Sequence, residues 1–287
     1  MTGPEGTPGG ATGKRGQVTG QPDWVPPGVD TKRANIARVY DYWLGGTHNF
    51  LADQDLARAM AAVEPNIRHG ARANRAFIGR AVRHMAAAGV RQFLDIGSGI
   101  PTQANVHEVA QQAAPGSRVV YVDVDPVAIA HSKAILARND SADVIDADLR
   151  EPEKILAHPV TRELIDFSQP VGLLLAMVLH FVSDAEEPWQ VVGTLRDALA
   201  PGSFLAVSHV NNEGRPEAAK AAGRVYNRSV ATGVHMRSHA EIQRFFDGFR
   251  LLDPGVVYIP QWRPDSPDDV PADPSQFWVL VGVGQKP

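Results

Sequence analysis

The stretch that decides the fold is QFLDIGSGIPTQ, residues 92–103. It begins as a short apolar run, reaches an acid at Asp95, and then places Gly97 and Gly99 one residue apart. This order is typical of a buried β-strand that feeds a tight turn and then a helix. The turn could hold a dinucleotide, another nucleoside-bearing cofactor, or no ligand at all.

Apolar runs and helical periodicities alternate after this turn. The runs that predict strands cover residues 91–96, 117–123, 142–148, 171–179 and 202–210, with two last strands at 255–260 and 276–284. The segments that predict helices between them cover residues 103–113, 126–138 and 187–200, and a further helix begins at Ser238. This alternation predicts an α/β fold with a doubly wound, mostly parallel sheet covered by helices on both faces.

The chain before the first strand divides into two parts. Residues 1–28 are rich in Gly, Pro and Thr, and they predict a disordered tail because they bury too little apolar surface to offset ordering. Residues 29–90 predict a helical segment, which we expect to form a lid. Residues 91–287 are expected to form the core with a helical insert at about 211–237, so that residues 29–287 make one structural domain.

The composition narrows the class of protein. The chain of 287 residues is 44% hydrophobic and 21% charged, with a net charge of −4. These values are ordinary for a globular domain and provide no basic field for nucleic acid. No apolar run is long enough for a membrane span, and the first residues lack the apolar core of a secretory signal. Cysteine is absent, in agreement with a reducing compartment, so we expect a cytoplasmic protein without membrane or nucleic-acid partners.

Acids at the ends of successive predicted strands narrow the choice of cofactor. Ligands of parallel sheets bind at the carboxyl ends of the strands, where Asp95, Asp123 and Asp148 are expected. The dinucleotide fingerprint requires a third glycine, and Thr102 stands there, which weakens the NAD or FAD alternative without excluding it. Carboxylates repel a pyrophosphate and suit a nucleoside that carries positive charge. Asp123 could accept from ribose hydroxyls, and Asp148 from an exocyclic amine beside the backbone N–H of Leu149.

Successive motifs resemble those of class I S-adenosylmethionine-dependent methyltransferases. They are FLDIGSGIPTQ, VVYVDVDP, DADLR and LLLAMVLHFVSD. Two further stretches, NIARVYDYWLGGTHNFLAD and RANRAFIGRAVRHMAAAGVRQFLDIGSGIPT, resemble the narrower S-adenosyl methyltransferase family, first catalogued as a domain of unknown function. The resemblance runs from about residue 30 to the end of the chain.

The resemblance carries expectations about fold and cofactor. It implies a seven-stranded Rossmann-like sheet of order 3-2-1-4-5-7-6 with an antiparallel last strand. It implies S-adenosylmethionine as cofactor and S-adenosylhomocysteine as product. Residues 97–99 would then lie beside the methionine part, Asp123 at the ribose, and Asp148 and Leu149 at the adenine.

Two features of the helical segment extend the candidate cofactor site. Arg68, Arg72 and Arg75 share a helix face, and either of the last two could clamp the methionine carboxylate, with a solvated basic face as the alternative. Asn49 follows a Gly-Gly break, which suggests a loop close to the cofactor. The full set of candidate cofactor-binding residues is Asp95, Gly97, Ser98, Gly99, Thr102, Asp123, Val124, Asp148, Leu149, Met177, Arg72 and Asn49.

The candidate catalytic residues are His180 and Tyr42. His180 follows the fourth predicted strand and His209 ends the fifth, so either imidazole could act as a base, although a hydrogen-bonded rim residue is the plainer interpretation of His180. A base is required only when the methyl acceptor holds its proton tightly. The histidines show no metal-ligand spacing, so no metal is expected.

The sequence leaves the methyl acceptor, its reacting atom and the oligomeric state open. We expect a methyltransferase that acts on a small molecule. A non-catalytic binder of the same cofactor is the main alternative, and an NAD-dependent oxidoreductase is the third.

Overall fold

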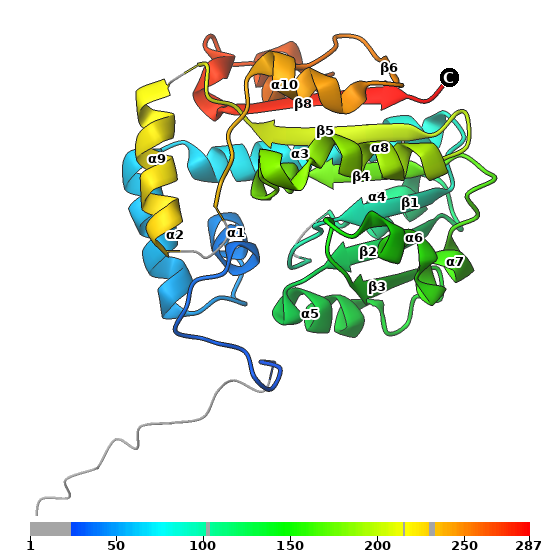
Figure 1. The fold of residues 1–287 in the computed structure, drawn as a ribbon, viewed down its shortest axis with the longest axis horizontal. Helices are drawn as coiled ribbons and strands as arrows, with labels where there is room; N and C mark the ends of the chain where they lie inside the picture. The colour runs from blue at the N-terminus through cyan, green and yellow to red at the C-terminus, as the bar shows by residue number, and fades with distance from the viewer. Residues whose placement is uncertain (1–23, 102–103, 215, 230–232) are drawn as a thin grey trace, which may run out of the picture.

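The computed structural model describes residues 24–101, 104–214, 216–229 and 233–287. Its centre is an open sheet, most of which runs horizontally across Figure 1. The strands follow the order β3 (Ala142–Asp146), β2 (Arg118–Asp123), β1 (Gln92–Ile96), β4 (Gly172–Ala176), β5 (Phe204–Val210), β8 (Val279–Gln285) and β6 (Arg250–Leu251). The first five of these strands are mutually parallel, and β8 is antiparallel to β5.

The predicted fold class and strand order are confirmed, with one difference at the sheet edge. The described residues form an eight-stranded sheet, because β6 adds one strand to the seven expected. The strand expected at residues 255–260 is reduced to β7 (Val257–Tyr258), which pairs with β8 beside β6. A 3-10 turn at Ile259–Gln261 ends β7, and Pro260 within it has no N–H to donate to a ladder. The short β6 carries no recognisable strand pattern and was not expected.

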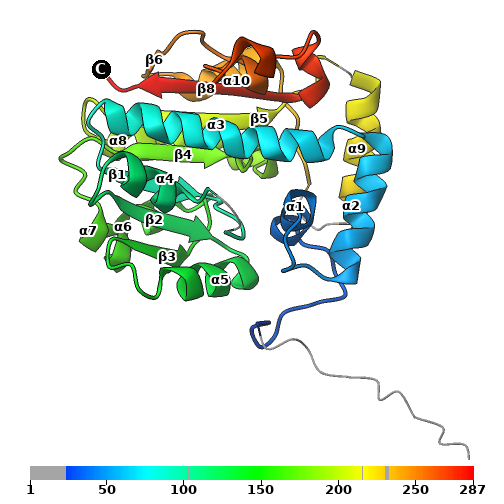
Figure 2. The same ribbon diagram turned by 180° about the vertical axis from the view of Figure 1, so that it is seen from behind.

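Helices cover both faces of the sheet, as Figures 1 and 2 show from opposite sides. One face carries α3 (Ile67–Ala87), α4 (Val106–Ala113) and α5 (Pro126–Leu136), and the other carries α6 (Pro152–Ala157), α7 (Pro159–Leu164), α8 (Pro188–Ala198) and α10 (His239–Gln243). Successive residues of a strand pack on opposite faces of the sheet. Phe93 packs in the core on the α3 side, and Leu94 packs in the core on the α8 side. The sheet is therefore buried on both faces, and a ligand must approach it from an edge.

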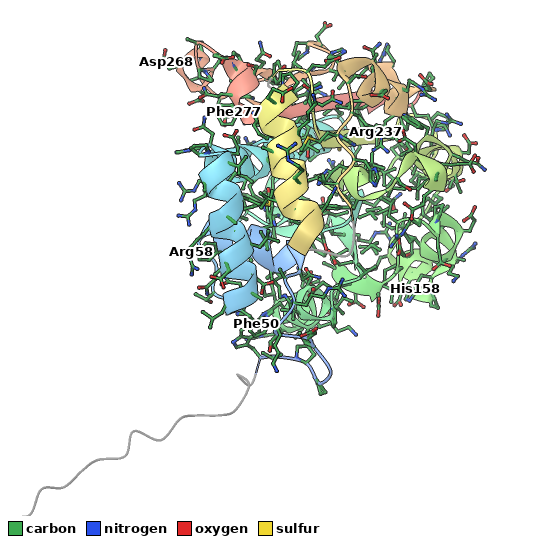
Figure 3. All side chains as sticks on the ribbon, turned by 60° about the vertical axis from the view of Figure 1, so that its left-hand side comes forward. Phe50, Arg58, His158, Arg237, Asp268 and Phe277 are labelled. Carbon is green, nitrogen blue, oxygen red and sulfur yellow. The ribbon has the colours of Figure 1, made fainter. Side chains whose placement is uncertain are left out.

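A third group of helices lies beyond the carboxyl ends of the parallel strands. It consists of α1 (Ile36–Leu44), α2 (Leu51–Val63) and α9 (Pro216–Ser229). Figure 3 shows α2 and α9 side by side. Val39, Trp43, Leu56 and Tyr226 bury an apolar cluster between these helices and the start of α3. The expected lid and the expected insert thus share one small core. Among the described helices, none is long and apolar enough to cross a membrane.

Candidate functional site

A cavity of about 470 Å³ lies at the carboxyl ends of β1 to β4, under the segment that leads into α1. The volume falls in the usual range for small-molecule sites, which is roughly 300–1,000 Å³. The candidate residues that line it are Asp95, Gly97, Ser98, Gly99, Asp123, Val124, Asp148, Leu149 and Met177. Thr102 lies outside the described residues. The structure therefore brings most of the predicted set to one place.

The turn after β1 needs its glycines for two different reasons. Gly97 has φ +74°, and a Cβ there would lie 2.4 Å from Cγ2 of Val178. Gly99 has φ +67°, and no atom lies within 4 Å of the position its Cβ would take. The first glycine allows close packing, and the second leaves backbone open toward the cavity. Between them, the hydroxyl oxygen of Ser98 is buried without a hydrogen-bond partner.

Asp123 ends β2 and is held by three backbone N–H groups. Its Oδ2 accepts from Gly99 at 2.7 Å, and its Oδ1 accepts from Val124 and Asp125 at 2.8 and 2.9 Å. Oδ2 keeps a free lone pair, because a carboxylate oxygen can accept two hydrogen bonds. Burial raises the pKa of Asp123 to about 6, against the lowering effect of these N–H donors. The fixed carboxylate is suited to accepting from a ligand hydroxyl.

Asp95 lies at the end of β1 and is almost fully buried. Burial raises its pKa to about 7, while the Arg75 guanidinium opposes the rise and Asp123 adds to it. Two buried carboxyls beside each other make this part of the cavity favourable for a cation.

Asp148 follows β3, and its carboxylate is already engaged. It accepts from the Arg150 guanidinium at 2.9 and 2.6 Å and from the Arg150 backbone N–H at 2.9 Å. Burial raises the pKa of Asp148, but Arg150 outweighs this and leaves it below its usual value. An amine that approaches Asp148 would share this carboxylate with Arg150.

Arg75, rather than Arg72, reaches the cavity. Arg75 lines it, and its Nε is buried without a hydrogen-bond partner. Arg72 is exposed on the other side of α3. The helical repeat puts both residues near one face, but a difference of three residues is enough to rotate Arg72 away from the sheet. The candidate clamp is therefore Arg75.

Asn49 and Tyr42 also lie away from the cavity. The Asn49 side-chain amide donates to Asp41 at 2.8 Å and to the Gly46 carbonyl at 3.0 Å, so it holds its own turn. Gly46 is required by the same turn, since a Cβ would lie 2.0 Å from Asp41 Oδ1. Tyr42 faces Arg58 and Arg68 on the outside of α1. Two residues earlier and on a different side of α1, Tyr40 lines the cavity in the place expected for Tyr42.

The segment over the cavity packs against the core through an apolar contact. Trp24, Val29 and Ala37 pack on Ile100 and on the start of α5. Beside them, the rings of His48 and His131 lie 3.6 Å apart between centroids. Burial lowers the pKa of His131, and His48 lowers it further. The contact fixes the segment beside the cavity.

A second cavity of about 110 Å³ adjoins the first. Ile36, Tyr40, Met177 and Phe181 line both, so the two spaces meet at these residues. Met177 has φ +55°, a strained conformation for a residue with a side chain. The Tyr40 hydroxyl is fixed by bonds to the Ala71 carbonyl and the Asn74 amide, both at 3.0 Å.

His180 lines the second cavity and not the first. Its Nδ1 is buried without a partner, and burial, with His209 and Arg237 nearby, lowers its pKa well below the usual value. His209 is different, because its Nδ1 faces the Val210 carbonyl at 2.8 Å and its Nε2 faces the Arg237 guanidinium at 2.9 Å. A carbonyl only accepts and a guanidinium only donates, so the His209 ring has no free lone pair for a proton.

The polar groups that line the larger cavity match those that S-adenosylmethionine would need. A buried hydroxyl and a buried guanidinium nitrogen lack partners, and a carboxylate is held at the end of β2. Sequence reasoning missed Tyr40, because its place on an apolar helical stripe identified it as a core residue. Arg33 and Asn74 also line the cavity, and no sequence signal pointed to them.

Solved structures with this fold provide close comparisons. A proposed methyltransferase from Thermobifida fusca is 44% identical with a TM-score of 0.87, over 92% of this chain and 99% of that one. A DUF574 family protein from Streptomyces avermitilis is 38% identical with a TM-score of 0.85, over 90% of this chain and 99% of that one.

More distant structures share the fold alone. An O-methyltransferase family protein from Burkholderia thailandensis is 13% identical with a TM-score of 0.51, over 82% of this chain and 61% of that one. Among curated protein sequences, none matches this chain. The family model described as S-adenosyl methyltransferase matches residues 22–287.

Proposed function

The chain belongs to the S-adenosyl methyltransferase family, and from this premise we propose that it transfers a methyl group from S-adenosylmethionine to a small-molecule acceptor. S-adenosylmethionine is its cofactor and S-adenosylhomocysteine the product. The observation that carries the proposal is the pair of adjoining cavities, which share Tyr40, Met177 and Phe181 as a common wall.

We assign the larger cavity to the cofactor. Asp123 would accept from the ribose hydroxyls through its free lone pair on Oδ2. Gly97, Ser98 and Gly99 would border the methionine part, and the Arg75 guanidinium would pair with its carboxylate. Asp148 and the backbone of Leu149 would border the adenine. Arg75 replaces Arg72 in this assignment, and Asn49 has no part in it.

The chemistry needs alignment more than acid–base groups. The cofactor supplies a methyl group on a positively charged sulfur, which is already reactive toward a nucleophile. The protein must hold the acceptor in line and exclude water. The apolar wall of Tyr40, Met177 and Phe181 can do both, and His180 Nδ1 is the nearby group that could take a proton.

We further propose that residues 29–90 act as a lid on a core of residues 91–287. The packing of Val29 and Ala37 against Ile100 and α5 supports this division. The helical insert within 211–237 would close the acceptor side through α9. A cytoplasmic location remains a prediction from composition. The disordered tail expected at residues 1–28 also remains one for residues 1–23, which lie outside the described residues, whereas Trp24 packs with Ile100 and the start of α5.

Calorimetric titration with S-adenosylmethionine, S-adenosylhomocysteine and NAD tests the proposal. The first two should bind, and Asp123→Ala should weaken both by about tenfold or more, as lost bonds to a charged group cost about 1.5–3 kcal/mol. Asp146→Ala, at the exposed end of β3, is the matched control and should change nothing. Binding of NAD alone would refute the proposal. Cofactor binding without methyl transfer to any of a broad set of acceptors would leave a binding protein instead.

A further inference from the structure

The second cavity has a lining that the cofactor does not explain. Among the described residues, its walls carry the phenyl, phenol and indole rings of Tyr40, Trp43, Phe181, Tyr226, Phe277 and Trp278. Phe181 and Tyr226 stack with centroids 6.0 Å apart, so part of the wall is a fixed flat surface. Flat apolar walls of this kind pack best against another flat apolar molecule.

The size of the cavity limits its occupant. About 110 Å³ is slightly less than the roughly 150 Å³ of an apolar cavity that holds a benzene molecule. The cavity is therefore comparable in size to a single ring, and a short substituent must use the space that continues past Tyr40 into the cofactor cavity.

Three buried polar atoms on this apolar lining have no hydrogen-bond partner. They are Nδ1 of His180, the hydroxyl oxygen of Tyr226 and Nε1 of Trp278. The exposed fractions of these residues are 4%, 2% and 7%, so bulk water does not satisfy them. Leaving such a group unpaired costs about 1–3 kcal/mol, which a bound ligand can recover.

The chemistry of these atoms favours a hydroxyl group on the ligand. An indole N–H only donates, so Trp278 needs an acceptor, whereas the imidazole and the phenol can take either role. A hydroxyl both donates and accepts, and it can pair with any of the three. An aromatic amine accepts poorly and would leave Trp278 unpaired.

Charge disfavours anionic acceptors. Among the described residues that line the cavity, none is Lys or Arg, while Glu64 contributes a carboxylate. Glu64 Oε1 accepts from the backbone N–H of Asn66 at 2.8 Å, which fixes this acid near the lining. A benzoate-like ligand would place a second negative charge in an apolar space without a counter-ion.

We propose that the second cavity is the acceptor site and that it binds a one-ring phenol, which is methylated on oxygen. This inference rests on the proposed function. The phenol oxygen forms the new O–CH3 bond and its O–H bond breaks, with the proton passing to His180 Nδ1, which releases it when the products leave the cavity. The S–CH3 bond breaks, and its electron pair stays on the sulfur of S-adenosylhomocysteine.

Matched ligands test the ligand class. Protein saturated with S-adenosylhomocysteine is titrated with 4-ethylphenol, 4-ethylaniline, 4-ethylbenzoate and ethylbenzene. The phenol should bind at least fivefold more tightly than the other three, as expected for a recovered hydrogen bond. With S-adenosylmethionine, mass spectrometry should detect the methyl ether of 4-ethylphenol.

Two variants test the location. Ala222→Leu should fill the cavity and reduce phenol affinity more than tenfold, whereas the adjacent Gly223→Ala adds a Cβ with no atom within 4 Å and should not. Tyr226→Phe keeps the ring and removes one unpaired atom. It therefore provides a second measurement of phenol affinity if Ala222→Leu folds poorly. Affinity for S-adenosylhomocysteine should stay unchanged in all three.

The outcomes distinguish the inferred phenol site from the proposed methyltransferase function. Phenol selectivity that is lost in Ala222→Leu or Tyr226→Phe supports the inference. Equal affinity for ethylbenzene, or bound phenol without an ether product, overturns it. Binding of S-adenosylhomocysteine without binding of any aromatic ligand overturns it and leaves the proposed function standing. A wild-type protein that does not bind S-adenosylhomocysteine overturns the proposed function itself.

Discussion

Asp95 and Asp123 make cofactor affinity depend on pH. Burial raises their pKa values to about 7 and about 6, so both carboxyls titrate near neutral pH. A cationic cofactor prefers the ionised forms, and its affinity should therefore rise between pH 5.5 and 8 and then level off. Calorimetry across this range measures the effect. Asp95→Asn should remove the upper part of the rise, and a flat wild-type profile would contradict the assignment.

Asp95 and Asp123 change the free energy of unfolding in the opposite direction from cofactor affinity as the pH rises. Their folded-state pKa values lie above the unfolded value near 3.8, so the folded protein binds more protons between about pH 4 and 7. Their contribution to the free energy of unfolding is therefore most favourable in acid and declines as the pH rises to about 7. Cofactor binding should offset this decline at neutral pH.

Arg75 and Arg72 form a natural matched pair on α3. Arg75→Ala should weaken cofactor affinity about tenfold or more, because a charge-assisted bond to a carboxylate contributes about 1.5–3 kcal/mol. Arg72→Ala should change the binding free energy by less than about 0.5 kcal/mol, since its side chain is exposed. Titration of both variants with S-adenosylhomocysteine decides the matter. Equal losses would remove Arg75 from the site.

Site residues could be predicted from the sequence where the local backbone conformation determines their position. The acids at the strand ends and the glycines of the first turn are local consequences of a strand that meets a turn, and the structure places them together. Arg75 and Tyr40 could not be separated from Arg72 and Tyr42 in the same way. Their roles depend on the rotation of α1 and α3 about their axes, which tertiary packing sets.

At the level of elements, Asp53 holds the lid in place. Its carboxylate accepts from the Asn35 and Phe50 backbone N–H groups at 2.8 Å each and lies 3.3 Å from Arg38 Nε. All three partners belong to the segment that covers or borders the cofactor cavity. Asp53 itself is fully buried. Its hydrogen bonds therefore join the start of α1 to the start of α2.

Asp53→Ala should lower the free energy of unfolding by about 3 kcal/mol, as expected when a buried ion pair loses one partner. Hydrogen exchange should show α1 opening more readily, and cofactor affinity should fall. Asp55→Ala, which removes an exposed pair with Arg58 on the same helix, should cost less than about 1 kcal/mol. Similar losses in the two variants would argue against this role of Asp53.

The elements that sequence patterns missed are short. Two six-residue helices, α6 and α7, each begin with a proline and offer less than two turns of periodicity. The strand β6 has two residues and was also missed, whereas β7 was expected but is two residues long instead of six. Such elements form because β8 or the sheet face beside them is already in place, so their own sequence carries little signal.

At the scale of the whole molecule, cofactor binding should stabilise the lid and the core together. S-adenosylhomocysteine at about a hundredfold excess over its dissociation constant adds about 2.7 kcal/mol. The melting temperature should then rise by about 5 °C or more. Differential scanning calorimetry measures this, with NAD as the control ligand. A shift confined to a separate lid transition would show that lid and core unfold independently.

The fold class was predictable because strict alternation of strand and helix favours a parallel sheet covered on both faces. The strand order was expected only from the resemblance to known methyltransferases. The second cavity was not predictable. Its lining comes from α1, α2, α3, α9 and the loop before β8, and no local pattern shows that these segments meet.

The reversed direction of β8 separates the end of this chain from its chemistry. Because β8 runs against β5, its last residues lie at the amino ends of the parallel strands, far from α1 and α9 in Figure 1. Lys286 is fastened there by donating to the carbonyls of Arg196 and Leu199. A tag or a tether to a sensor surface joined beyond β8 should therefore leave both cavities open, whereas one joined just before Trp24 would crowd their cover.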